Sequence, residues 1–269
     1  MNVRRPARAL ALASLLLLPL ASRAQQVVTL TGGEWLPYIS QTLPHYGPIA
    51  RIVTEAFALE GVRVNYTFRP WSRAFAEAAN DLANGTLVWS VSDDDSERAR
   101  RFLRSDVVFH SQSVFFHLKS YPFRWRGEQS LADMRIGGTA GYEYQFDKAT
   151  QSRMDLSAPT DTLNFHKLLA GRFDVFPANL DVGLWIMRTE LPPDQAGLIA
   201  WDPRPYHVAH YHLLLNKRNP DNERYMALFN RGLKRLRASG KYESYLRGLS
   251  PVPKWPGGDG AMKKAPSAP

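Results

Sequence analysis

The chain has 269 residues, no cysteine and a formal net charge of +9 at pH 7. Without cysteine there is no disulfide and no lipid-modified N-terminal thiol, so stability has to come from a buried apolar core, for which this length suffices. The positive charge does not indicate nucleic-acid binding, because the clearest basic cluster lacks base-stacking aromatic residues and is typical of a solvated helix face.

The first residues have the pattern of an export signal. Arg4, Arg5 and Arg8 precede an apolar run at 9–20, and Ser22 and Ala24 are the small residues expected just before a cleavage site. The run is too short for a membrane anchor, which needs about 20 apolar residues. We predict that residues 1–24 are a signal peptide and that the mature protein is periplasmic in a cell with an outer membrane.

Behind this leader, the sequence predicts strands and helices in alternation. Pro48 stands at the favoured first position of a helix, Ser72 can cap the next helix, and Asn84-Gly85 turns the chain into a third strand. The expected elements are a strand at 27–30, a helix at 48–60, a strand at 62–68, a helix at 73–82 and a strand at 87–89. This order predicts one doubly wound α/β lobe.

A second series of the same kind follows. Its expected elements are a strand at 134–137, a turn at 138–141, a helix from about residue 143, a helix at 162–170 capped by Asp161, a strand at 173–176 and a helix at 180–189. Extended runs at 113–118 and 206–215 flank this series, and a long helix at 221–239 comes after it.

These patterns predict the fold class: two doubly wound α/β lobes joined by two crossover strands. Lobe 1 is expected at 25–112 and 207–249, and lobe 2 at 113–206. The tail at 250–269 is rich in proline and glycine and is expected to be disordered.

The candidate ligand-binding residues follow the third predicted strand. In an open α/β sheet, ligands bind at the carboxyl ends of the strands. Arg98 can hold a carboxylate or phosphate through two parallel hydrogen bonds, with Ser90 and Ser92 as nearby donors. The alternative is a surface ion pair between Arg98 and one of the acids Asp93, Asp94 and Asp95.

Short motifs along 27–249 resemble, in their order and spacing, the extracellular solute-binding proteins of family 3, the periplasmic components of amino-acid-type ABC importers. The motifs are Trp35-Leu36-Pro37-Tyr38, Pro70-Trp71-Ser72-Arg73-Ala74, Ser96-Glu97-Arg98, the run 131–137, Gly141-Tyr142 and the run 169–175. The resemblance implies a periplasmic-binding-protein-like fold that closes over one small solute and presents the closed form to an inner-membrane permease.

The resemblance also implies roles for individual residues. Arg98 would clamp the α-carboxylate of the ligand, and Gly141-Tyr142 would offer backbone N–H groups at a helix start. The aromatic side chains expected to flank the ligand are Trp35, Tyr38 and Trp71.

The sequence departs from the family at two places. Tyr142 stands where a small hydroxyl residue is usual, and Asn179 stands where amino-acid binders carry an aspartate for the ammonium group of the ligand. Either the solute lacks an α-ammonium group, which we favour, or another acid such as Asp93 or Asp181 binds it.

Other classes of function are less well supported. His207, His210 and His212 lack the further ligands of a zinc site, and the glycine patterns of nucleotide sites are missing, so we expect no metal and no cofactor. No G-x-S-x-G nucleophile motif is present, which favours a binding protein over an enzyme. A dehydratase on the same fold and a receptor that signals to a membrane kinase stay open as alternatives.

We expect a monomer whose partners are a small solute and a permease, without nucleic acid.

Overall fold

The computed structural model describes residues 26–91, 97–142 and 144–250. The predicted signal peptide, Ser92, Asp93 and residues 251–269 of the predicted tail lie outside the described residues. Within the described part of the chain, no helix combines the length and the apolar character that a membrane span requires.

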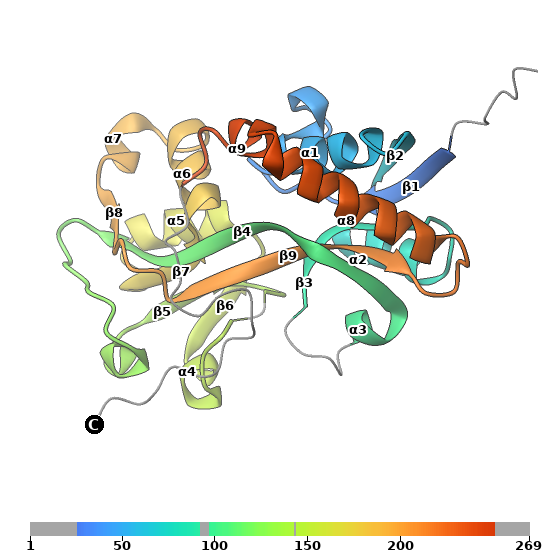
Figure 1. Ribbon diagram of the computed structural model, residues 1–269. Helices are drawn as coiled ribbons and strands as arrows, with labels where there is room; N and C mark the ends of the chain where they lie inside the picture. The colour runs from blue at the N-terminus through green and yellow to red at the C-terminus, as the bar shows by residue number, and fades with distance from the viewer. Residues whose placement is uncertain (1–25, 92–96, 143, 251–269) are drawn as a thin grey trace, which may run out of the picture.

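One open sheet runs through the whole molecule, in the order β2-β1-β3-β9-β4-β7-β5-β6, with β8 beside β4. At one end of the sheet β1 pairs in parallel with β2 and β3, and at the other end β5 pairs in parallel with β6 and β7. Between them, β4 and β9 pair antiparallel and span the two halves of the molecule (Figure 1). The strands are β1 (Gln26–Gly32), β2 (Val62–Phe68), β3 (Gly85–Ser90), β4 (Phe102–Leu118), β5 (Ile136–Thr139), β6 (Met154–Ala158), β7 (Val175–Asn179), β8 (Ile199–Trp201) and β9 (His207–Asn216).

This architecture confirms the predicted fold class of two α/β lobes joined by two crossover strands. We call the part with β1, β2 and β3 lobe 1 and the part with β5, β6 and β7 lobe 2. The extended run expected at 113–118 is the end of one longer strand, β4, so the boundary expected after residue 112 falls inside this strand.

Lobe 1 carries helices on both faces of its strands. They are α1 (Pro48–Ala58), α2 (Trp71–Ala79), α3 (Glu97–Arg101), α8 (Asn222–Ala238) and α9 (Lys241–Tyr245), with a short 3-10 helix η1 (Pro44–Tyr46) before α1. Pro48 opens α1 as expected. Ser72 does not cap α2, because this helix begins at Trp71, two residues earlier than expected, and Ser72 lies inside its first turn.

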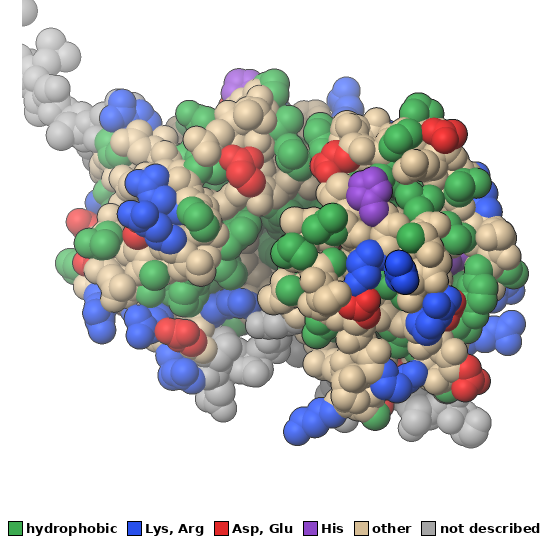
Figure 2. Space-filling model, turned by 180° about the vertical axis from the view of Figure 1, so that it is seen from behind, with side chains coloured by type: hydrophobic (Ala, Val, Ile, Leu, Met, Phe, Trp, Pro, Cys, Tyr) green, Lys and Arg blue, Asp and Glu red, His purple; other side chains and the backbone are tan. Residues whose placement is uncertain are grey.

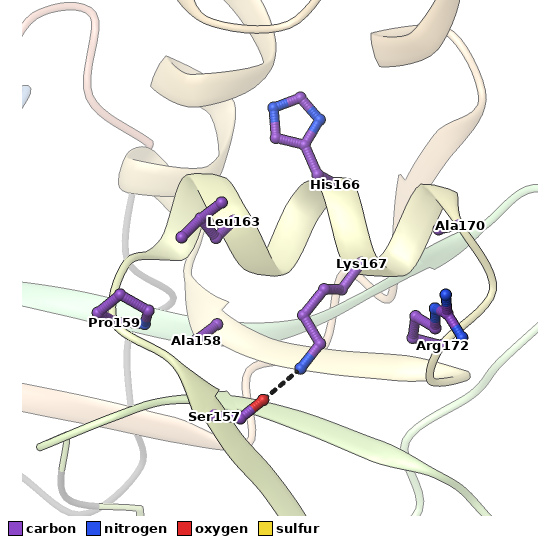
Figure 3. Close-up of a pocket in the computed structure, with 8 residues that line it drawn as sticks. All are labelled: Ser157, Ala158, Pro159, Leu163, His166, Lys167, Ala170 and Arg172. Atoms are coloured by element: carbon purple, nitrogen blue, oxygen red, sulfur yellow. Dashed lines mark hydrogen bonds between the residues drawn. The ribbon is translucent and has the colours of Figure 1, made fainter.

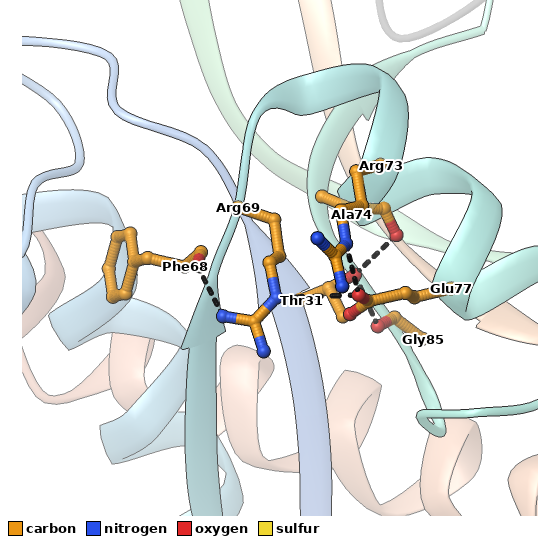
Figure 4. A network of polar contacts seen from close by, with 7 residues as sticks. All are labelled: Thr31, Phe68, Arg69, Arg73, Ala74, Glu77 and Gly85. Atoms are coloured by element: carbon orange, nitrogen blue, oxygen red, sulfur yellow. Dashed lines mark hydrogen bonds and ion pairs between the residues drawn. The ribbon is translucent and has the colours of Figure 1, made fainter.

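Polar contacts fix α2 against the strands of lobe 1 (Figure 4). The Thr31 hydroxyl on β1 donates to the Ala74 carbonyl at 2.7 Å. On the outer side, Glu77 accepts hydrogen bonds from Arg73 at 2.9 Å and from Arg69 at 3.3 Å. The hydrogen bond from Arg73 lowers the pKa of Glu77. These contacts hold the start of α2, and with it Trp71, near the carboxyl end of β1.

Lobe 2 differs from the prediction at its helix starts. Its helices are α4 (Lys148–Ser152), α5 (Asp161–Leu169), α6 (Leu180–Thr189) and α7 (Pro193–Ala196), with the 3-10 helix η2 (Glu128–Leu131). The helix expected from about residue 143 begins only at Lys148, where Asp147 accepts from the Thr150 amide. Thr160, and not Asp161, caps α5. The bounds expected for α6 are confirmed.

The apolar core extends from one lobe into the other. A single cluster of buried side chains includes Phe57 and Phe229 in lobe 1, Phe109 on β4, and Phe165 and Phe176 in lobe 2. A smaller cluster around Phe115 lies on the other face of the lobe 2 strands. Because burial of apolar surface is the main stabilising contribution, this shared core explains how the chain manages without disulfides.

Candidate functional site

The carboxyl ends of the inner strands of both lobes approach one another beside the crossover strands. β1 ends at Gly32, β3 at Ser90 and β7 at Asn179, and β4 and β9 pass between the lobes. Seen from behind, the molecule is hollowed between its two lobes (Figure 2). We call this region the interlobe cleft. Carboxyl ends of strands are where open α/β sheets bind ligands, so this is the candidate site.

Four aromatic side chains join lobe 1 to the crossover strands, and we call them the hinge aromatic cluster: Trp35, Tyr38, Phe109 and Tyr211. The rings of Phe109 and Tyr211, which are opposite each other on β4 and β9, stack with centroids 4.8 Å apart. Trp35 lies 4.9 Å from Tyr211 and 4.6 Å from Tyr38, again between ring centroids. Such contacts contribute beyond area burial, so the cluster fixes the loop after β1 against the hinge.

Tyr38 connects this cluster to lobe 2. Its hydroxyl lies 2.8 Å from Asn179 Oδ1 and 2.8 Å from Asp181 Oδ2 at the start of α6. Burial, and then the negative charge of Asp181, raise the pKa of Tyr38 well above its usual value. The other carboxylate oxygen of Asp181 accepts from the Ser250 amide at 2.7 Å. The structure therefore brings together two predicted site residues, Tyr38 and Asn179.

Trp71 and Arg98 both contact Trp89 on β3. The rings of Trp71 and Trp89 contact each other edge to face, with centroids 5.2 Å apart. The Trp71 indole N–H donates to the Glu34 carbonyl at 3.1 Å. The Arg98 guanidinium lies 4.9 Å from the Trp89 ring centroid and donates to the Ser90 carbonyl at 2.8 Å. These contacts hold Arg98 at the carboxyl end of β3. It also lines a cavity of about 320 Å³ beside Phe102 and Leu214.

The expected anion site at Gly141-Tyr142 is not formed by a helix start. Gly141 has φ +81°, and the Tyr142 amide donates to the Thr139 carbonyl at 3.2 Å, which closes a tight turn. The next helix begins at Lys148. The Tyr142 side chain is 54% exposed. The expected helix start at this turn was therefore wrong, whereas a role of Gly141 and Tyr142 in binding stays a prediction.

Two residues near the cleft were missed in the sequence. Tyr211 belongs to the hinge aromatic cluster, where its ring contacts those of Trp35 and Phe109. Burial raises the pKa of this phenol, and the positive charge of Arg98 acts in the opposite direction. Asp161 is buried at the start of α5, where its carboxylate accepts a hydrogen bond from the Thr139 hydroxyl, and burial raises the pKa of this acid. Tyr211 lies within the extended run expected at 206–215, where nothing in the local pattern distinguishes it, and Asp161 was expected only as a helix cap.

The three histidines considered as metal ligands, His207, His210 and His212, lie on the crossover strand β9. The rings of His110 on β4 and His210 on β9 are 4.6 Å apart between centroids. His212 Nδ1 lies 2.7 Å from the Ser105 carbonyl, and burial lowers the pKa values of His207 and His212. Among the residues that the structure describes, no group of three or more possible ligands is arranged to hold a metal ion.

No protein-family model matches the sequence, and no curated protein matches it. Solved structures do share the fold. A histidine kinase sensor domain with similarity to periplasmic binding proteins is 19% identical, with a TM-score of 0.65, over 82% of this chain and 95% of that chain.

Two further solved structures are ligand-binding proteins. The GluR0 ligand-binding core from Nostoc punctiforme, in complex with L-glutamate, is 15% identical, with a TM-score of 0.62, over 81% of this chain and 97% of that chain. The arginine-, lysine-, histidine-binding protein ArtJ from Geobacillus stearothermophilus is 17% identical, with a TM-score of 0.61, over 85% and 97%. The chain therefore has the fold of the periplasmic binding proteins, and the resemblance to family 3 holds at the level of the fold.

Proposed function

We propose that this protein is a solute-binding protein that captures one small, carboxylate-bearing solute in the interlobe cleft. The observation that carries the proposal is the contact of Tyr38 with Asn179 and Asp181, because it joins residues of both lobes at the edge where the strands end. Arg98, held at the end of β3, is the proposed anion-binding residue. Ligand-binding neighbours of the same fold support this role.

The proposed setting is the periplasm, with delivery of the solute to an inner-membrane ABC permease. The export pattern in residues 1–24 supports this setting. So does the likeness in fold to an amino acid ABC transporter substrate-binding protein from Streptococcus pneumoniae. We further propose that the protein is a monomer and that the lobes divide as 25–112 with 207–249, and 113–206.

The direct test is to express the chain with its leader, purify the mature protein from the periplasm and identify any bound small molecule by mass spectrometry. We expect one solute in stoichiometric amount, recovered unchanged after incubation with the protein. Conversion of that solute into a product would contradict the proposal and favour an enzyme.

A second candidate function is sensing, because the histidine kinase sensor domain described above has the same fold. The two functions differ in what a deletion strain loses. Loss of solute uptake supports transport, whereas normal uptake with a lost transcriptional response to the solute supports sensing.

A further inference from the structure

Asn179 presents a hydrogen-bond donor, and not an acceptor, at the edge of the interlobe cleft. Its Oδ1 caps α6 by accepting from the amides of Asp181 at 3.1 Å and Val182 at 3.2 Å, and it lies 2.8 Å from the Tyr38 hydroxyl. Backbone amides can only donate, so the Asn179 side-chain atom that they contact must be the oxygen and not the nitrogen. The amide nitrogen donates to no residue that the structure describes, and Asn179 is only partly buried.

Two acids of lobe 2, Asp181 and Asp161, accept hydrogen bonds from protein groups. Both oxygens of Asp181 accept hydrogen bonds, one from Tyr38 at 2.8 Å and one from the Ser250 amide at 2.7 Å. The carboxylate of Asp161 accepts from the Thr139 hydroxyl, to which Asn164 also donates at 2.9 Å. An ammonium group placed against Asn179 would face the amide nitrogen, which is itself a donor, and Asp181, whose two oxygens already accept hydrogen bonds. An unpaired buried charge costs several kcal/mol.

Two donors that follow the carboxyl ends of strands, Arg98 after β3 and Asn179 at the end of β7, suit a different chemistry. A guanidinium is built to bind a carboxylate, and the Asn179 amide nitrogen can donate to a second oxygen of the same molecule. The hinge aromatic cluster offers an apolar surface beside them. We propose that the solute is a 2-oxo or 2-hydroxy carboxylic acid without an ammonium group, whose carboxylate binds Arg98 and whose C2 oxygen accepts from Asn179. This inference rests on the proposed function.

The test uses pairs of compounds that differ only at C2: L-phenylalanine with phenylpyruvate and L-phenyllactate, and L-leucine with its 2-oxo and 2-hydroxy analogues. Calorimetry with the mature protein is expected to show that the oxygen-bearing member of a pair binds at least about tenfold more tightly, since about 1.4 kcal/mol corresponds to tenfold. Tighter binding of the amino acids overturns the inference.

Asn179→Asp is the sharpest variant, because a carboxylate caps a helix as well as an amide does and replaces the donor by an acceptor. We expect it to fold and to lose at least about tenfold in affinity for the oxygen-bearing acids. Asn65→Asp, at an exposed position of β2, is the matched control and should bind as the unmodified protein does. Unchanged preference in Asn179→Asp overturns the proposed role of this amide.

Two further outcomes separate this inference from the proposed function. Amino-acid binding that disappears in Asp161→Asn would identify Asp161 as an ammonium acceptor and overturn the inference, while the solute-binding function stands. If neither series binds, the inference is overturned. The proposed function falls with it only if the protein purified from the periplasm also carries no solute.

Discussion

The Tyr38 hydroxyl, carried by the loop after β1, lies 2.8 Å from Asp181 Oδ2 in the first turn of α6. Both side chains are buried, at 1% and 8% exposure. The contact crosses from lobe 1 to lobe 2, so it is sensitive to how the lobes lie relative to each other. The Ser250 amide, at the end of the described chain, completes the surroundings of the same carboxylate.

Tyr38→Phe is expected to lower the free energy of unfolding by about 1–3 kcal/mol, because it leaves a buried carboxylate oxygen without its donor. Urea unfolding followed by fluorescence measures this loss. Tyr66→Phe is the matched control, since the Tyr66 hydroxyl also lies in hydrogen-bonding contact with buried groups, but only within lobe 1. Only Tyr38→Phe should change solute affinity as well; an equal effect of both variants on affinity would refute the role of Tyr38 between the lobes.

Arg98→Ala is expected to weaken solute binding by roughly tenfold to a few hundredfold, because hydrogen bonds to charged groups contribute about 1.5–3 kcal/mol each. Arg98→Lys should restore only part of the affinity, since an ammonium group cannot form the paired contact of a guanidinium. Calorimetry with the co-purified solute measures both. Arg100→Ala, on the same short helix, controls for a general loss of positive charge. Equal losses for Arg98→Ala and Arg100→Ala would show that no specific clamp exists.

Local patterns predicted most of the fold. Pro48 marked the start of α1, and the stretch 180–189 was expected as a helix with the bounds that α6 has. The helix expected from about residue 143 was wrong because tertiary packing prevailed there. Tyr144 and Phe146 stack with ring planes 6° apart, and Phe146 packs on Phe115 of β4. A local sequence pattern cannot predict a contact with Phe115, which is so distant in the sequence.

The candidate site was predictable only in part. Trp35, Tyr38 and Asn179 were identified individually, but the sequence could not show that Tyr38 contacts Asn179, more than a hundred residues away. Tyr211 was missed because a tyrosine on a crossover strand looks like any half-buried strand residue. The orientation of the Asn179 amide follows from its capping role, which became evident only with the helix start in place.

The pair Lys167–Asp155 predicts an acid-dependent loss of stability. It lies beside the cavity of about 320 Å³ between β6 and α5, where Lys167 Nζ also donates to Ser157 (Figure 3). The hydrogen bond from Lys167 lowers the pKa of Asp155 to about 2. A lowered pKa stabilises the folded state above the unfolded value of about 3.9, and the stabilisation is lost as pH falls from there through the folded value.

Asp155→Asn should therefore flatten the fall in the free energy of unfolding between about pH 4 and pH 2. The effect is expected to be small, because the Asp155 side chain is 40% exposed and solvent screens the pair. Denaturant unfolding at a series of pH values measures the slope. A variant with the same slope as the unmodified protein would show that this pair contributes nothing.

Gly232→Ala is expected to destabilise the protein by about 1–3 kcal/mol or more, because extra volume in a packed interface strains the backbone. A Cβ atom at Gly232 on α8 would lie 1.9 Å from the Ala56 carbonyl oxygen on α1, so the two helices would have to separate. Ala227→Ser, on the exposed face of α8, is the control. If Gly232→Ala unfolds at the same temperature as Ala227→Ser, the close approach of the two helices is disproved.

A crystal structure of the mature protein with its co-purified solute tests the central claim most directly. We expect the solute in the interlobe cleft, with its carboxylate on Arg98, an oxygen within hydrogen-bonding distance of Asn179 Nδ2, and its remaining atoms against Trp35 or Tyr211. A solute bound elsewhere, such as the cavity beside Lys167, with Arg98 and Asn179 contacting only protein, would contradict it.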